Sequence, residues 1–267
     1  MTLAFDLYLA RRSPLHRLDP RVKIILLAAG TIVLLAMQNL FVCLAWLLVN
    51  HFLFLAARVP LTRLRVLWAA MLPLSLLVFV TWPLVYQEGG AVLLAFWRVK
   101  ITALSVVHGL ALALRLNALA QMYFLLLLTT DQMTLVRGLV RLGAPFEWGL
   151  TLAIALRYIP VFFGAFQMIA EAQQARGLRL NQAGWLGRLR AYLPILVAMI
   201  ISALRTIDNL ARAIEARALG ASAHRTSLKT LAFTRSDWAV LIIGGLAAII
   251  LLYARAALGF GAHPLYF

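Results

Sequence analysis

The chain has 267 residues, of which 64% are hydrophobic and only 13% are charged. A soluble domain is about half apolar and about a quarter charged, so this composition excludes an ordinary soluble protein and is typical of an integral membrane protein. The formal net charge is +16. Because no basic module with interleaved aromatic residues is visible, we assign this charge to membrane topology, to anionic lipids and to acidic partners rather than to nucleic acid.

The N-terminal segment, residues 1–21, is basic and contains two proline-directed turns. It lacks the small-residue cleavage site that closes a secretory signal, so we predict a retained, cytoplasmic N-terminus. Apolar runs follow over residues 22–37 and 40–57, and the polar pair Gln38-Asn39 separates them. They predict a tight hairpin of two transmembrane helices, the first of them short.

A third span is predicted over residues 67–85, after a basic loop in which Pro60 is a candidate helix start. The stretch from Ile101 to Thr130 is long enough for a fourth, tilted span. It carries Arg115, and a charged side chain inside hydrocarbon is costly unless it faces protein or water. Arg115 is therefore either a polar contact on a substrate or partner path, or an arginine satisfied by a neighbouring helix or by the interface.

Residues 131–235 hold 13 of the 25 Lys and Arg residues. They predict a short amphipathic helix capped by Asp131, a second helix from about Glu147 to Arg176, and a third from about Pro194 to Leu219. Arg157, in the second helix, is a further possible polar residue within the membrane. We place much of this region at the cytoplasmic interface, where basic amphipathic helices lie in the membrane plane. Residues 238–258 predict a final span.

The predicted fold is therefore an all-α, polytopic integral membrane protein with about five transmembrane helices. Residues 1–130 form an N-terminal membrane domain with four spans, residues 131–235 form cytoplasmic or interfacial helices, and residues 236–267 contain a C-terminal transmembrane helix.

Two of the predicted helices end on the same pattern, which reads Ala172-Gln173-Gln174-Ala175-Arg176-Gly177 and Ala213-Ile214-Glu215-Ala216-Arg217-Ala218. An ordinary helix end explains part of it, because a basic residue in the last turn contributes about 0.3–1 kcal/mol and Gly suits a left-handed cap. The repetition favours a second interpretation. Small Ala residues allow close approach, and a planar guanidinium binds carboxylate in a bidentate way, so the two ends suit a partner with two similar acidic grooves, such as an ATPase dimer.

The second pattern has Ala218 where the first has Gly177. Because Ala does not reach positive φ at low cost, we expect the second helix to continue past Arg217 to Gly220.

The chain has no phosphate-binding loop, no nucleophile elbow and no cluster of metal-binding residues in its sequence. We therefore predict no catalytic residue, no metal site and no cofactor, and we assign Cys43 to an apolar run as a small hydrophobic residue. Two other functions remain open: a conventional permease that carries its own substrate and, more remotely, an integral membrane enzyme.

The sequence resembles the transmembrane T component, EcfT, of energy-coupling factor (ECF) vitamin and metal transporters, a group that includes CbiQ- and BioN-like proteins. The resemblance rests on five segments, which are Ser13-Pro14-Leu15-His16, residues 18–23, Leu156-Arg157-Tyr158-Ile159-Pro160 and the two Ala-Arg endings.

The resemblance implies that each Ala-Arg ending closes a cytoplasmic coupling helix and contacts acidic residues of one of two ABC-type ATPase subunits. The coupling residues would then be Ala175, Arg176, Gly177, Ala216, Arg217 and Ala218. It also implies a small substrate-binding membrane protein (the S component) as a partner and a location in the cell membrane, the inner membrane where a cell has two. The transported vitamin or transition metal would be chosen by that partner, so it cannot be read from this chain.

Overall fold

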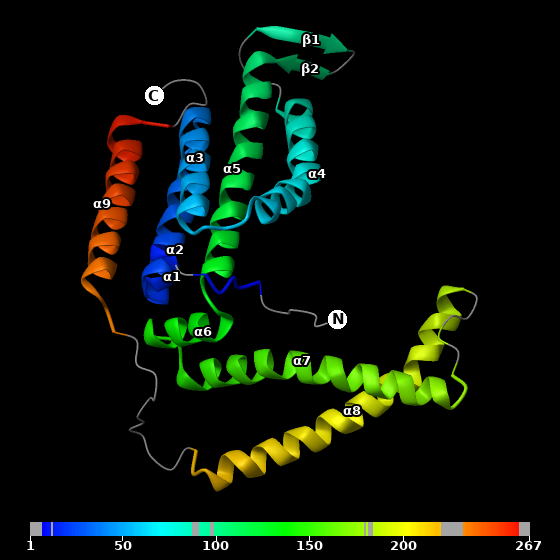
Figure 1. Cartoon of the computed structure of the whole chain (residues 1–267). Coiled ribbons are helices and arrows are strands. Elements are labelled where there is room, and N and C mark those ends of the chain that lie inside the picture. Colours follow the sequence, from blue (N-terminus) through cyan, green and yellow to red (C-terminus); the bar gives the residue numbers. More distant parts are fainter. Residues whose placement is uncertain are drawn as a thin grey trace. The chain divides into compact units, whose positions relative to one another are not determined.

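The computed structural model describes residues 7–11, 13–86, 91–96, 99–178, 180, 184–219 and 232–261. Within these residues the chain forms nine helices and one two-stranded hairpin (Figure 1). The elements are α1 (Pro14–Arg17), α2 (Pro20–Ala36), α3 (Leu40–Ala56), α4 (Leu61–Val85), β1 (Val92–Phe96), β2 (Val99–Thr102), α5 (Ala103–Thr129), α6 (Gln132–Arg141), α7 (Phe146–Ala175), α8 (Trp185–Ala216) and α9 (Arg235–Leu258).

Five of the described helices are long and apolar enough to cross a membrane, which confirms the predicted fold class. They are α4, α5, α7, residues 187–216 of α8, and α9. The set differs in part from the predicted spans, because α2 and α3 have only 17 residues each, or about 25 Å of helix. The position of α7 and α8 at the cytoplasmic interface, and with it the three-part division of the chain, stays a prediction.

The described residues fall into two compact units. The larger unit contains α1 to α6, the hairpin and α9, and the smaller unit contains α7 and α8. In the larger unit α5 packs against α3 and α4, and α2 packs against α9, α5 and α6. The hairpin lies at the end of α5 far from α1 (Figure 1).

Side chains at the chain's turns decide where most helices of the larger unit begin. The carboxylate of Asp19 accepts a bond from the Arg21 amide, and Asn39 accepts bonds from the amides of the first turn of α3. Thr102, Asp131 and Thr234 cap α5, α6 and α9 in the same way. Such caps satisfy backbone donors that would otherwise be lost at a helix start, so the break predicted at Gln38-Asn39 and the cap predicted at Asp131 are both confirmed.

Prolines lie inside two of the long helices. The helix α8 begins at Trp185 and runs through Pro194, which we expected near its start, whereas α7 runs through Pro160 as the predicted helix from Glu147 to Arg176 requires. Apolar helices tolerate an internal proline when nearby groups satisfy the carbonyl that it frees. The helix α4 begins at Leu61, directly after Pro60, which confirms Pro60 as a helix start and makes the helix longer than the span predicted over residues 67–85.

Two clusters of buried side chains hold the larger unit together. One joins the ends of α3, α4 and α5 through Phe54, Val59, Leu67 and Leu128. The other joins α2 to α9 through Val33, Met37 and Ala248. Much of the remaining helical surface is exposed and apolar, which suits contact with lipid or with apolar partners.

Candidate functional site: two arginine-ended helices

The first arginine end closes α7. Ala175 is the last helical residue, Arg176 is the C-cap, and Gly177 follows with a positive φ of 92°. The Gly177 amide donates to the Gln174 carbonyl at 2.9 Å. The Leu178 amide donates to the Gln173 carbonyl at 3.0 Å, and this pair of bonds defines a Schellman motif.

The second arginine end closes α8 with the same geometry. Ala216 is the last helical residue, Arg217 is the C-cap, and Ala218 follows with a positive φ of 54°. The Ala218 amide donates to the Glu215 carbonyl at 2.8 Å, and the Leu219 amide donates to the Ile214 carbonyl at 3.2 Å. The two helices therefore end with one hydrogen-bond pattern, shifted by the same number of residues as the sequence repeat.

The expected continuation of the second helix past Arg217 is wrong. The helix α8 stops at Ala216, and Ala218 takes the left-handed conformation despite its Cβ. The two Schellman bonds oppose the steric cost of that conformation, which is about 1–2 kcal/mol for a residue with a Cβ. Gly220, which we expected to end the helix, lies outside the described residues.

The structure adds one residue to each pattern that sequence reasoning missed. Leu178 and Leu219 each follow the left-handed residue and supply the amide that closes the motif. The repeat is therefore Ala-x-x-Ala-Arg-x-Leu. The shared Leu was a usable signal, because a Schellman motif is often accompanied by an apolar residue at this position.

Both arginines are exposed on the smaller unit, as are Ala175 and Ala216 beside them. The helices α7 and α8 cross and run in opposite directions, so their C-terminal ends lie at opposite ends of the pair (Figure 1). The crossing is held by the ring of Phe166, which stacks on Tyr192 with centroids 6.4 Å apart. The arrangement presents two similar guanidinium groups to two separate places rather than to one.

Arg157, the predicted polar residue of α7, is also exposed and lies away from both ends of that helix. The structure does not bring it together with Arg176 or Arg217 on one end.

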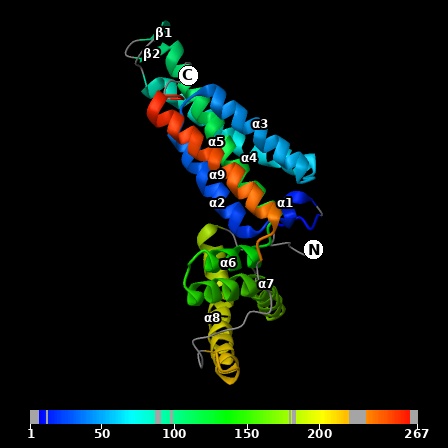
Figure 2. The same cartoon turned by 90° about the vertical axis from the view of Figure 1, so that its left-hand side faces the viewer.

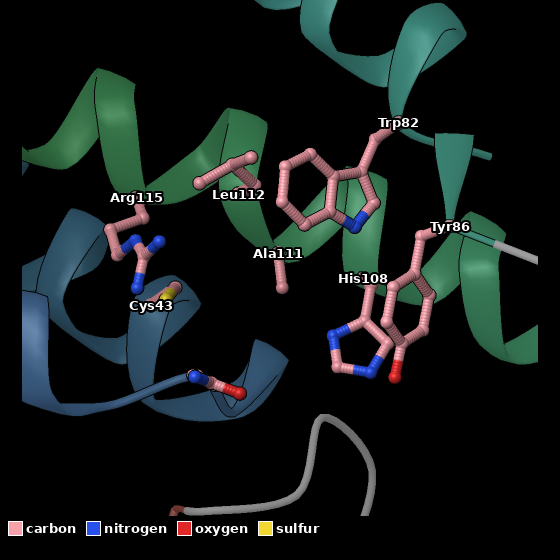
Figure 3. A pocket seen from close by; sticks show the side chains of 8 residues that line it. Cys43, Trp82, Tyr86, His108, Ala111, Leu112 and Arg115 are labelled. Carbon is pink, nitrogen blue, oxygen red and sulfur yellow. The ribbon is translucent and has the colours of Figure 1, made fainter. Parts of the chain in front are cut away.

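Arg115 lies in the larger unit, where it lines a cavity of about 220 Å³ between α3, α4 and α5 (Figure 3). Arg115 and Cys43 lie at one end of this cavity, and the rings of Tyr86 and His108 lie at the other, with centroids 5.0 Å apart. The Arg115 guanidinium donates to the carbonyl of Met37 at 3.4 Å, and Met37 is the C-cap of α2. The Arg115 guanidinium is thus hydrogen-bonded to the end of a neighbouring helix, and its role stays a prediction.

Two further polar side chains of α5 lie in the same unit. Asn117 donates to the Ala113 carbonyl and to the hydroxyl of Ser75, which joins α5 to α4. Gln121 is 1% exposed, and its amide group makes no hydrogen bond within the described part of the chain.

The segment Leu18 to Lys23 forms a polar clasp at the N-terminal ends of α2 and α9, which lie together in Figure 2. The Asp19 amide donates to Asp237 at 2.8 Å, while the Asp19 carboxylate pairs with Arg21 at 3.1 Å. The Arg21 guanidinium lies over the ring of Phe233, and Lys23 donates to the carbonyl of Thr129. This segment therefore links distant parts of the chain, which the linear sequence did not reveal.

The fold is that of a multi-pass α-helical membrane protein. Its smaller unit carries two exposed helix C-termini, each ending on an arginine. The model of the CbiQ family, described as cobalt transport protein, matches residues 11–228. The chain belongs to this family.

Curated relatives cover nearly the whole chain. The energy-coupling factor transporter transmembrane protein EcfT of Listeria innocua is 33% identical over 93% of this chain and 97% of its own length. The protein of the same name from Thermosediminibacter oceani is 31% identical over 91% of this chain and 94% of its own length. A third, from Thermanaerovibrio acidaminovorans, is 30% identical over 94% of this chain and 96% of its own length.

Proposed function

We propose that this chain is the transmembrane coupling subunit of an ECF-type ABC importer. It links ATP hydrolysis by two ATPase subunits to reorientation of a small substrate-binding membrane protein, which delivers a vitamin or a transition metal to the cytoplasm. The chain itself catalyses no reaction in this proposal. Membership of the CbiQ family and the EcfT relatives support it over a permease that carries its own substrate.

The observation that carries the mechanism is the identity of the two helix ends. Arg176 and Arg217 occupy equivalent cap positions, both are exposed, and they lie at opposite ends of the crossed pair of helices. A carboxylate-lined groove on each ATPase subunit would receive one guanidinium through a bidentate contact. Two equivalent ends suit two copies of one motor.

Movement would follow from that attachment. When the two ATPase subunits change their separation during the ATP cycle, each pulls on one end of the α7–α8 pair. Each helix would then move as a rigid body, and the two would pivot about the contact of Phe166 with Tyr192. The exposed apolar faces of α7 and α8 would carry that motion to the membrane and to the substrate-binding partner.

Attachment of the motors at Arg176 and Arg217 requires the smaller unit to face the cytoplasm. We place the N-terminus in the cytoplasm as well, because Lys and Arg are enriched on the cytoplasmic side of membrane proteins and the N-terminal segment is basic. Arg115 has a positioning role in this scheme, since its bond to Met37 fixes the end of α2.

The experiment is a double charge reversal, Arg176→Glu with Arg217→Glu, in the assembled transporter. We expect the ATPase subunits to be lost on purification and uptake to fall to background, because like charges would face each other in both grooves. The matched control is Arg190→Glu with Arg205→Glu, two exposed arginines on α8 that belong to neither Ala-Arg ending. Retention of ATPase subunits and of transport by the first variant would refute the proposal.

A further inference from the structure

A second cavity, of about 660 Å³, lies in the larger unit where α1, the C-terminal end of α3 and the N-terminal end of α9 meet. The residues that line it form a polar group and an apolar group. Arg17, Arg58 and Ser236 are polar, whereas Leu15, Leu18 and Val240 are apolar. We propose that this cavity binds one anionic phospholipid, with its phosphate between the two arginines and the first carbons of its acyl chains against the apolar side.

Arg58 is presented to the cavity at a conformational cost. It has a positive φ of 55° and follows the C-cap of α3, a position that favours glycine. Its amide donates to the Leu55 carbonyl at 2.9 Å, and its own carbonyl accepts a bond from the Arg11 guanidinium at 2.6 Å. The Val59 amide donates to the Phe54 carbonyl at 3.1 Å, so α3 ends with the same Schellman motif as α7 and α8, and the residue at its left-handed position is a cation that lines the cavity.

The field inside the cavity is cationic. Arg17 and Arg58 are both exposed, and the salt bridge recorded in the described part of the chain joins Arg21 to Asp19 instead. The nearby carboxylate of Asp237 is buried and accepts bonds from the Asp19 amide and from Thr234. Within the described residues no carboxylate pairs with Arg17 or Arg58, and an anion is the complementary ligand.

The other two hydroxyl groups of the lining already have hydrogen-bond partners. The hydroxyl of Ser13 is bonded to the His16 ring, and that of Thr234 is bonded to Asp237. The arginines and Ser236 thus supply the polar contacts, which are donors suited to phosphate oxygens.

The position of the cavity favours a lipid over a free anion. It lies at the N-terminal end of α9, which is long and apolar enough to span the bilayer. Trp238 stands 54% exposed on the first turns of that helix, and Trp is enriched at membrane interfaces. Two arginines beside an apolar wall, at the end of a membrane-spanning helix, suit the anionic headgroup and the acyl chains of a phospholipid in the cytoplasmic leaflet.

The test is native mass spectrometry of the assembled transporter in detergent, titrated with phosphatidylglycerol. The test variant is Arg17→Gln with Arg58→Gly, which removes both charges and also relieves the strained backbone, so the fold is retained. The control is Arg63→Gln with Arg65→Gln, which removes two exposed charges of α4 that do not line the cavity. We expect the dissociation constant to rise roughly fivefold for each cavity arginine removed and by less than about twofold in the control.

Equal weakening in both double variants would overturn the proposal, as would unchanged binding in the test variant. Two further arms separate the possible ligands. Phosphatidylcholine should not displace the bound lipid, and inorganic phosphate at millimolar concentration should displace it poorly. Displacement by inorganic phosphate as effective as by phosphatidylglycerol would overturn the assignment to a lipid.

Discussion

Ala218 and Gly177 share a left-handed backbone conformation, but only Ala218 carries a Cβ. Within the described residues, and apart from the adjoining chain, nothing lies within 4 Å of the place where a Cβ on Gly177 would stand, so the cost of a Cβ there is conformational rather than a clash. The second Ala-x-x-Ala-Arg-x-Leu pattern tolerates Ala218 because the two Schellman bonds hold the end of α8, and with it Arg217, in place.

We expect Ala218→Gly to stabilise the end of α8 by about 1 kcal/mol. Hydrogen exchange of the Ala218 and Leu219 amides should slow by about fivefold, since 1 kcal/mol is that factor in an equilibrium constant. The mirror variant Gly177→Ala should speed exchange at the end of α7. Attachment of the ATPase subunits should persist in both variants, because Arg176 and Arg217 keep their positions.

His16 is held in place through its ring. Its ring is bonded to the Ser13 hydroxyl at 2.7 Å and to the Leu9 carbonyl at 2.9 Å. Burial lowers the pKa of His16 below its ordinary value of about 6.5, and the nearby charges of Lys23 and Arg11 act in the same direction. The folded state therefore favours the neutral ring.

A lowered pKa gives a definite sign to the dependence of stability on pH. The stabilisation is present above about pH 6.5 and is lost as the pH falls through the lowered pKa of the folded state. We expect the thermal unfolding temperature of the wild type to fall more between pH 7.5 and pH 5 than that of His16→Gln. Parallel curves for the two proteins would contradict a titrating His16.

At the scale of elements, the clasp between α2 and α9 rests on one carboxylate. Asp237 accepts bonds from the Asp19 amide, the Thr234 amide and the Thr234 hydroxyl, and its side chain is almost fully buried. Asp237 therefore caps its own helix and holds the start of α2 at the same time.

Replacing Asp237 with Ala should lower the free energy of unfolding by about 2 kcal/mol, because buried donors on Asp19 and Thr234 lose their acceptor. Chemical denaturation in detergent would measure the loss, and hydrogen exchange should locate it at the first turns of α2 and α9. Thr234→Ser keeps the hydroxyl and should unfold close to the wild type. A similar loss in Thr234→Ser would mean that packing of the Thr methyl group, not the carboxylate network, stabilises this end.

At the scale of the whole molecule, two helix ends with one geometry imply two separable attachments. Each ATPase subunit would hold one end, so the loss of one contact should leave the other in place.

We expect Arg176→Glu and Arg217→Glu, made singly, to retain part of the ATPase and to abolish coupled uptake, because one attached motor cannot change the separation of the two ends. Native mass spectrometry would count the ATPase subunits, and an uptake assay in vesicles would measure transport. Normal uptake with either single variant would show that its end is dispensable.

The sequence by itself determined the membrane class, the starts of α3 and α6 and the two arginine ends. Apolar runs of sufficient length have few alternatives to a membrane helix, and Asn39 and Asp131 cap helices through local bonds that need no tertiary context. Motif spacing was enough to find Arg176 and Arg217, because both lie within a few residues of the helix that they end.

Only the tertiary structure decided the features that depend on distant segments. The carbonyl of Arg58, for example, accepts a bond from the Arg11 guanidinium, which lies in another part of the chain. The bond between Asp19 and Asp237 joins residues at the two ends of the sequence, and the partner of Arg115 is a carbonyl on another helix. Contacts of this kind come from packing between helices, and no local pattern of residues encodes which helices will meet.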